Sequence, residues 1–151
     1  MDRMKTFFKY FLVLVIFYFF STIMINSFLK VSYTELENYS INTQPLFVDV
    51  TEAEASKRDG HIYGVVKNNS DTVIENKYLK FSMLSKNENV LGTKYVKIEK
   101  IELNQLYNYE VEFDYDNVKS FKIELTDSMP EKVDFIELIK TNASDYINGI
   151  N

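Results

Sequence analysis

The sequence predicts a mainly β protein, an antiparallel β-sandwich that follows an N-terminal transmembrane helix and precedes a short C-terminal amphipathic helix. Two observations predict this class. A twenty-residue interval near the N-terminus is apolar and uncharged, and the chain beyond it divides into short strand-like segments separated by turn residues, about 8–12 residues apart. No helical pattern separates these segments, which argues against a parallel sheet. The expected parts are residues 1–30 (cytoplasmic stub and anchor), 31–44 (spacer), 45–127 (sandwich) and 128–151 (C-terminal helix).

The predicted anchor is the interval from Tyr10 to Leu29, which lies between Lys9 and Lys30. Thirteen of its twenty residues are Leu, Ile, Val or Phe, and about 20 apolar residues allow a helix to cross a bilayer core of roughly 30 Å. Those thirteen side chains favour insertion by roughly 4–8 kcal/mol in total. Because they cover every face of the helix, a buried core helix is disfavoured. Residues 10–29 are therefore expected to contact the lipid bilayer.

The charges beside the anchor predict its orientation. Arg3, Lys5 and Lys9 precede it, whereas only Lys30 follows it closely. Since cytoplasmic flanks carry the excess of Lys and Arg, we expect a single-pass protein of the cell membrane, with a cytoplasmic N-terminus and an extracytoplasmic C-terminal domain. A cleaved signal peptide is the alternative, but it has an apolar region of about 7–15 residues before an Ala-x-Ala type cleavage site. The segment Ile25 to Leu29 lacks that pattern.

Composition excludes several kinds of function. The 151 residues include no Cys, so disulfides, thiolate chemistry and lipid attachment through Cys are excluded. The formal net charge of −5 is unevenly divided, because the first 30 residues carry +3 and the remaining 121 carry −8. An acidic domain repels phosphate backbones, so no nucleic-acid partner is expected.

Turn residues divide the predicted sandwich into strands. Pro45 marks its start, and the sequences Asp59-Gly60, 68–71 (NNSD) and 86–89 (KNEN) mark turns. The predicted strands cover residues 46–51, 61–67, 73–85, 90–99, 107–115 and 118–126. Gly64 is expected near a β-bulge, where a strand glycine commonly lies.

The clearest alternation of apolar and polar residues lies in 107–116. Because successive strand side chains point to opposite faces, one face is expected to be buried and the other solvated. The buried face would hold Tyr107, Tyr109, Val111, Phe113 and Tyr115, and the solvated face Asn108, Glu110, Glu112, Asp114 and Asp116. Four of the five solvated residues are acidic and form a predicted acidic ladder.

In the C-terminal segment, apolar residues recur at the spacing of a helix and not of a strand. Ser128 and Glu131 fit a capping box, with Pro130 in the first helical turn. Gly149 is expected to end this helix. Apolar residues recur at helical spacing, namely Ile136, Ile139, Ala143, Tyr146, Ile147 and Ile150. We therefore expect an amphipathic helix that packs on the sandwich or on a partner.

Short motifs follow one another between Asp49 and Leu125. Residues 64–70 (GVVKNNS) contain the pattern G-x-V-x-N, 81–85 (FSMLS) has a Phe followed by Met, Leu and Ser, and 90–93 (VLGT) and 101–103 (IEL) come next. In this order the chain resembles the FxLYD-type domains of bacterial envelope proteins, although only Phe81 of the name motif is kept. The resemblance implies an immunoglobulin-like β-sandwich, often tethered to a membrane, and implies no activity.

No catalytic, cofactor-binding or metal-ligating residue is predicted, and no cofactor is expected. His61 is the only histidine, too few for a two-His metal site, and an exposed or half-buried structural role is expected. Same-face residues on one strand are about 6.6–7 Å apart, so the acidic ladder cannot converge on one Ca²⁺, which takes 6–8 oxygens. Gly60, Gly64 and Gly92 are isolated and form no phosphate-binding loop.

The sequence therefore favours a non-enzymatic module, tethered to a membrane, that binds a protein partner or stabilises an envelope complex. The alternative is a ligand- or cation-binding sensor that uses the acidic strand face.

Overall fold

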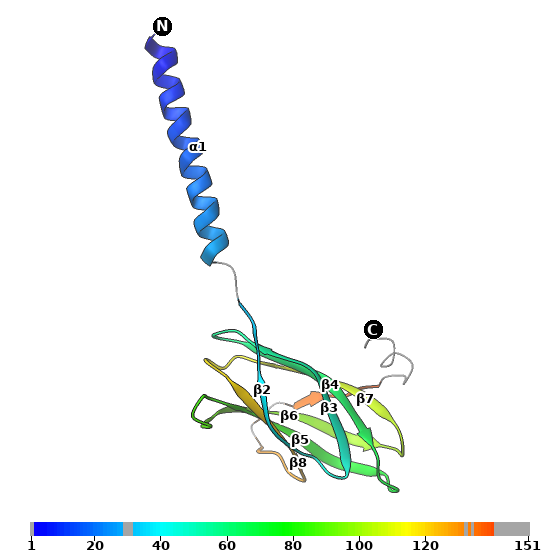
Figure 1. Cartoon of the computed structure of the whole chain (residues 1–151). Coiled ribbons are helices and arrows are strands. Elements are labelled where there is room, and N and C mark those ends of the chain that lie inside the picture. Colours follow the sequence, from blue (N-terminus) through cyan, green and yellow to red (C-terminus); the bar gives the residue numbers. More distant parts are fainter. Residues whose placement is uncertain (1, 29–31, 132, 134, 141–151) are drawn as a thin grey trace. The chain divides into compact units, whose positions relative to one another are not determined.

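A computed structural model describes residues 2–28, 32–131, 133 and 135–140. The chain forms two compact units, Met1–Ser32 and Tyr33–Asn151, of which the first contains one helix and the second is built of strands (Figure 1). The elements are α1 (Asp2–Phe28), β1 (Thr34–Glu35), β2 (Glu37–Asn42), β3 (Leu46–Ala55), β4 (Gly60–Asn68), β5 (Ile74–Leu84), β6 (Val90–Ile101), β7 (Leu106–Phe113), β8 (Ser120–Thr126), β9 (Phe135–Glu137) and β10 (Ile139–Lys140). The mainly β class and the N-terminal apolar helix are confirmed.

Helix α1 is long and apolar enough to cross a membrane, by length and composition. Its 27 residues contain no Gly or Pro, so no residue interrupts the helix. The most apolar part of Arg3–Ile25 has a mean hydropathy of 2.1, and none of it is buried. Leu29 and Lys30, at the end of the predicted anchor, lie outside the described residues.

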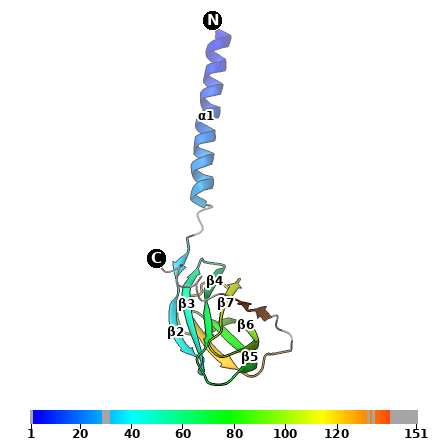
Figure 2. The ribbon, with the colours of Figure 1, turned by 90° about the vertical axis from the view of Figure 1, so that its right-hand side faces the viewer.

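The strands form two five-stranded sheets. Sheet A has the order β1-β3-β4-β7-β10, and sheet B has the order β2-β8-β5-β6-β9. All pairs are antiparallel except β2 with β8 and β6 with β9, which are parallel. Figure 2, turned by 90°, shows β3, β4 and β7 beside one another and β5 beside β6. Each of the six predicted strands is present within a few residues of its expected limits.

Both sheets contribute to one hydrophobic core. The Phe81 side chain of β5 and the Tyr109 side chain of β7 are both fully buried, with ring centroids 5.2 Å apart. Val111 and Phe113 extend the buried face of β7, while Glu110 and Glu112 between them are exposed. The alternation predicted for 107–116 is confirmed for 109–113.

The turn after β4 depends on a buried Asn. Asn68 is 0% exposed, and its amide donates to the carbonyl oxygens of Thr72 (2.7 Å) and Ile101 (3.1 Å). Its side-chain oxygen accepts from the Ser70 backbone nitrogen at 2.9 Å. An Asn that bonds its neighbouring backbone is a favoured turn former, so the turn predicted at 68–71 is confirmed.

A β-bulge interrupts β3 opposite Gly64. The register shifts between Val50 and Glu52, leaving Thr51 as the extra residue, while Gly64 pairs with Val50. A Cβ atom on Gly64 would come within 3.0 Å of the Asp49 carbonyl oxygen and of the Tyr109 ring. Glycine is therefore required here for space. The bulge expected near Gly64 is present, on the neighbouring strand.

The Tyr109 hydroxyl lies over Gly64 and donates to the Asp49 carbonyl oxygen at 3.0 Å. Burial raises the pKa of this phenol above its usual range, so it stays protonated and remains a donor. The bond joins β7 to β3 across β4 and holds the backbone beside the bulge.

Tyr109→Phe is expected to lower the free energy of unfolding by about 1 kcal/mol, because one buried hydrogen bond is lost while the ring remains. Thermal unfolding followed by circular dichroism measures the loss. Tyr107→Phe is the matched control, since its hydroxyl donates to the half-buried Gln105 side chain. Equal melting temperatures for Tyr109→Phe and the parent would contradict a structural role for this bond.

The predicted spacer 31–44 is wrong, because most of its described residues are strand. β1 pairs with β3 in sheet A, and β2 pairs with β8 in sheet B. Leu36, the single residue between them, is 6% exposed and belongs to the core. The polar sequence predicted a linker, but burial of Leu36 and pairing with two open strand edges order it.

The predicted helix 128–151 is wrong over its described part. Residues Phe135–Glu137 form β9 on β6, and Ile139–Lys140 form β10 on β7. Ile136 and Leu138 pack against the core. This segment pairs with backbone groups on the open edges of β6 and β7. The hydrogen bonds gained there outweigh the preference for a helix that the spacing of its apolar residues indicates. Residues 141–151 lie outside the described part of the chain.

Candidate functional site on the outer face of sheet A

Acidic side chains gather on the solvent face of sheet A. Glu52 and Glu54 project from β3, while Ala53 and Ala55 between and after them are buried. The corresponding residues of β7 are Glu110 and Glu112. We call these four glutamates the acidic face; Glu52, Glu110 and Glu112 are exposed and Glu54 is half-buried.

His61 of β4 lies between the two acidic strands. It pairs with Glu54 on one side and with Glu112 on the other. The His61 Nε2 atom is 3.0 Å from the Glu52 Oε1 atom, and the His side chain is 20% exposed. Its ring lies 5.7 Å from the Tyr33 ring and 4.8 Å from the Tyr63 ring. The half-buried position expected for His61 is confirmed.

The register of the β3–β4 hairpin brings together three side chains of types that can ligate a metal ion. One donor atom each from Glu52, Glu54 and His61 lies within 4.8 Å of the others. The residue pattern of a single strand does not reveal this cluster, because its members come from two strands. The available signal was the pair Glu52-x-Glu54 together with the Asp59-Gly60 turn, which places His61 beside Glu54.

The acidic ladder predicted on 107–116 is shorter than expected. Glu110 and Glu112 lie on β7, but the strand ends at Phe113. Asp114 and Asp116 are exposed residues of the loop that follows. The acidic face therefore extends across neighbouring strands instead of along one strand.

The electrostatic environment of this face is negative. Burial first, then the hydrogen bond to Glu110 and the charges of Glu110, Glu112 and Glu52, raise the pKa of the Tyr63 phenol. Within the described part of the chain, no Lys or Arg forms an ion pair with any residue of the acidic face.

The outer face of sheet B differs, because its charges neutralise one another. Glu124 lies between Lys122 and Lys80, with N–O distances of 2.8 and 3.8 Å. Lys97 contacts Glu99 at 2.8 Å. Unbalanced negative charge is therefore a feature of one face of the β unit.

The three predicted core tyrosines have structural partners. Tyr109 is part of the core, and Tyr115 stacks on Phe113 with ring centroids 6.1 Å apart. The Tyr115 hydroxyl donates to the Thr93 carbonyl oxygen at 3.3 Å. None of the three is among the residues that line the groove described next.

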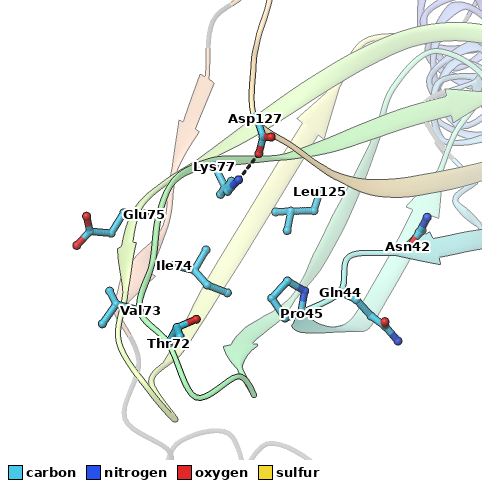
Figure 3. Close-up of a pocket in the computed structure, with 10 residues that line it drawn as sticks. All are labelled: Asn42, Gln44, Pro45, Thr72, Val73, Ile74, Glu75, Lys77, Leu125 and Asp127. Carbon is cyan, nitrogen blue, oxygen red and sulfur yellow. Dashed lines mark hydrogen bonds and ion pairs between the residues drawn. The ribbon is translucent and has the colours of Figure 1, made fainter.

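A separate groove of about 930 Å³ lies where the β2–β3 and β4–β5 connections meet the end of β8 (Figure 3). It is lined by Asn42, Gln44, Pro45, Thr72, Val73, Ile74, Glu75, Lys77, Leu125 and Asp127. Lys77 and Asp127 form an ion pair at its rim. Among these ten lining residues there is no histidine and no nucleophile beside a base, so the groove offers no catalytic constellation.

No family model matches this chain. Neither a curated protein nor a solved structure is significantly similar to it.

Proposed function

We propose that the chain is a membrane-tethered, non-enzymatic adaptor whose β unit is an immunoglobulin-like sandwich on the extracytoplasmic side of the cell membrane. The observation that supports the tether is α1, which is long and apolar enough to span a bilayer over Arg3–Ile25. Arg3, Lys5 and Lys9 at its N-terminal end support a cytoplasmic N-terminus.

The strand order supports the immunoglobulin-like assignment. In such sandwiches strand B lies beside E in one sheet, and C lies beside F in the other. With β4 as B, β5 as C, β7 as E and β8 as F, both neighbour relations hold. β3 and β6 then take the positions of A and C′. The place beside F is taken by β2, which comes from the anchor side of the chain and runs parallel to β8. This arrangement agrees with the FxLYD-type resemblance.

The acidic face supports the adaptor role. Its four glutamates have no Lys or Arg ion-pair partner among the described residues, so a basic protein surface can complement their charge. A membrane tether would confine this face near the bilayer and raise its effective concentration toward membrane-bound partners. The proposed partner is therefore a protein with a basic surface in the same envelope compartment.

The alternative function is cation sensing. The Glu52–Glu54–His61 cluster is the observation that favours it, because these donors lie close enough to share an ion.

Cross-linking from the acidic face tests the adaptor. The chain has no Cys, so Glu112→Cys, labelled with a benzophenone maleimide on intact cells, places one photo-cross-linker on the acidic face. We expect one discrete cross-linked product, weaker when NaCl is raised from about 0.1 to 1 M, because the Debye length falls from about 10 to 3 Å.

Glu99→Cys is the matched control, since Glu99 is an exposed glutamate on β6 of sheet B. The Glu99→Cys variant should be labelled equally well by the maleimide and should yield no discrete cross-linked product. Equal products from both positions, or none from Glu112→Cys despite labelling, would reject docking through the acidic face.

A further inference from the structure

The bulge in β3 gives the Glu52–Glu54–His61 cluster its geometry. Before the bulge the buried residues of β3 are Leu46 and Val48, and after it they are Ala53 and Ala55. The extra residue at Thr51 shifts the alternation by one position. Without this shift, Glu52 and Glu54 would point into the core. The fold therefore places both carboxylates on the outer face beside His61.

The histidine is fixed in orientation. Its ring contacts the rings of Tyr33 and Tyr63, and its Nε2 atom is 3.0 Å from a Glu52 carboxylate oxygen. Glu54 is directly opposite His61 in the hairpin register. The three donors thus converge from neighbouring positions of one hairpin, which is more rigid than a loop.

The surroundings favour a cation. Glu35 of β1 pairs with Glu54, and Glu112 of β7 pairs with His61, so one row across four strands contains three carboxylates and an imidazole. Lys57 and Arg58 occupy the turn between β3 and β4, and neither forms an ion pair with this row in the described structure.

We propose that Glu52, Glu54 and His61 form a binding site for a first-row divalent cation, Zn²⁺ foremost. One imidazole nitrogen and two carboxylate oxygens are the mixed donor set that zinc accepts, with bond lengths of about 2.0–2.2 Å. The donors lie within 4.8 Å of one another, and Glu54, which has three rotatable side-chain bonds, can close the remaining gap.

The same donors disfavour Ca²⁺ and Mg²⁺. Ca²⁺ takes 6–8 oxygen ligands, and Mg²⁺ requires near-octahedral oxygen coordination. Three protein donors leave at least one zinc coordination position for water or for a group from another molecule. The site would therefore resemble an open zinc site and not a closed structural one.

Zinc titration of the full-length chain in detergent micelles, without an oligohistidine tag, tests the site. Competition with a fluorescent zinc indicator should give saturable 1:1 binding. Because the chain has one His and no Cys, the His61 ring signals in NMR spectra report uniquely on ligation and should move with the same saturation curve.

Three variants separate ligation from general charge. His61→Gln and Glu54→Gln should each weaken zinc binding by about 10-fold or more, since even an outer partner of a metal ligand contributes 10–100-fold. Glu112→Gln removes a neighbouring carboxylate outside the cluster and should change affinity by less than about 3-fold. Circular dichroism verifies that each variant is folded.

Two results would overturn the proposal: no saturable binding up to about 100 µM Zn²⁺, or binding unchanged in both His61→Gln and Glu54→Gln. The first would leave Glu52 and His61 as an ion pair only. If a variant fails to fold, the His61 ring signals of the parent chain still show whether zinc binds at His61. The test needs no protein partner, so its outcome is independent of the adaptor.

Discussion

Replacing Gly64 with Ala is expected to lower the free energy of unfolding by about 2–4 kcal/mol. The added Cβ would meet the Asp49 carbonyl oxygen and the Tyr109 ring at less than 3.0 Å. The carbonyl belongs to backbone beside the bulge, and Tyr109 is 1% exposed, so neither group can move freely. Overpacking of this kind costs about 1–3 kcal/mol, and displacement of the Tyr109 hydroxyl loses a further hydrogen bond of about 1 kcal/mol.

Thermal unfolding of the full chain in detergent measures this loss, and each kcal/mol corresponds to about 2–8 °C across domains of 60–250 residues. Gly92→Ala is the matched control. Its Cβ would also meet a ring, that of Tyr115, but this side chain is half-buried and can turn aside. We therefore expect a smaller loss for Gly92→Ala. Equal losses for the two variants would show that the backbone contact at Gly64 is not the cause.

Gly64→Ala is also expected to affect the candidate site, through the β-bulge. Gly64 pairs with Val50, and the bulge that follows Val50 turns Glu52 and Glu54 outward. A Gly64→Ala variant that stays folded should therefore also bind zinc more weakly, although none of the three ligands is changed.

The central strands could be predicted because their side chains alternate locally. In β7, Val111 and Phe113 are buried while Glu110 and Glu112 are exposed, as the sequence indicates. In β3 the alternation reverses at Thr51, so the sequence pattern ends there although the strand continues to Ala55. The bulge depends on contacts with Gly64 and Tyr109, which belong to other strands, and no local pattern predicts such contacts.

The terminal segments could not be predicted for a related reason. Leu36 connects a strand of sheet A to a strand of sheet B, and Leu138 does the same at the opposite edges of both sheets. Each residue is flanked by short strands whose pairing partners are far away in the sequence. Their structure follows from open sheet edges, which exist only after the central strands have paired.

The candidate site could not be predicted either, because it too depends on how strands pair. The pair Glu52-x-Glu54 and the Asp59-Gly60 turn are visible in the sequence, but they do not fix the register in which His61 lies beside Glu54, seven residues away. Only the hairpin register, together with the bulge, makes them neighbours.

Two charges in the middle of α1 are expected to abolish membrane retention. Phe17→Arg combined with Phe20→Arg adds about 5–7 kcal/mol to the cost of insertion, at 2.5–3.5 kcal/mol per Arg near the helix centre. The apolar residues of the anchor favour insertion by roughly 4–8 kcal/mol, so the balance becomes about zero or unfavourable. The variant should move from the membrane pellet to the supernatant after alkaline carbonate extraction.

The control is Phe17→Leu with Phe20→Leu, which keeps the helix apolar and should remain in the membrane pellet. Adding Glu112→Cys to both variants reports the side of the membrane, because a membrane-impermeant maleimide has no other thiol to label. On intact cells it should label the leucine control and not the arginine variant. An intact mass for the unlabelled control within about 0.1 kDa of the 17.8 kDa of the parent chain would exclude a cleaved signal peptide. Pellet retention of the arginine variant would mean that α1 is not what holds the chain at the membrane, and the tether would then have to be sought in the β unit.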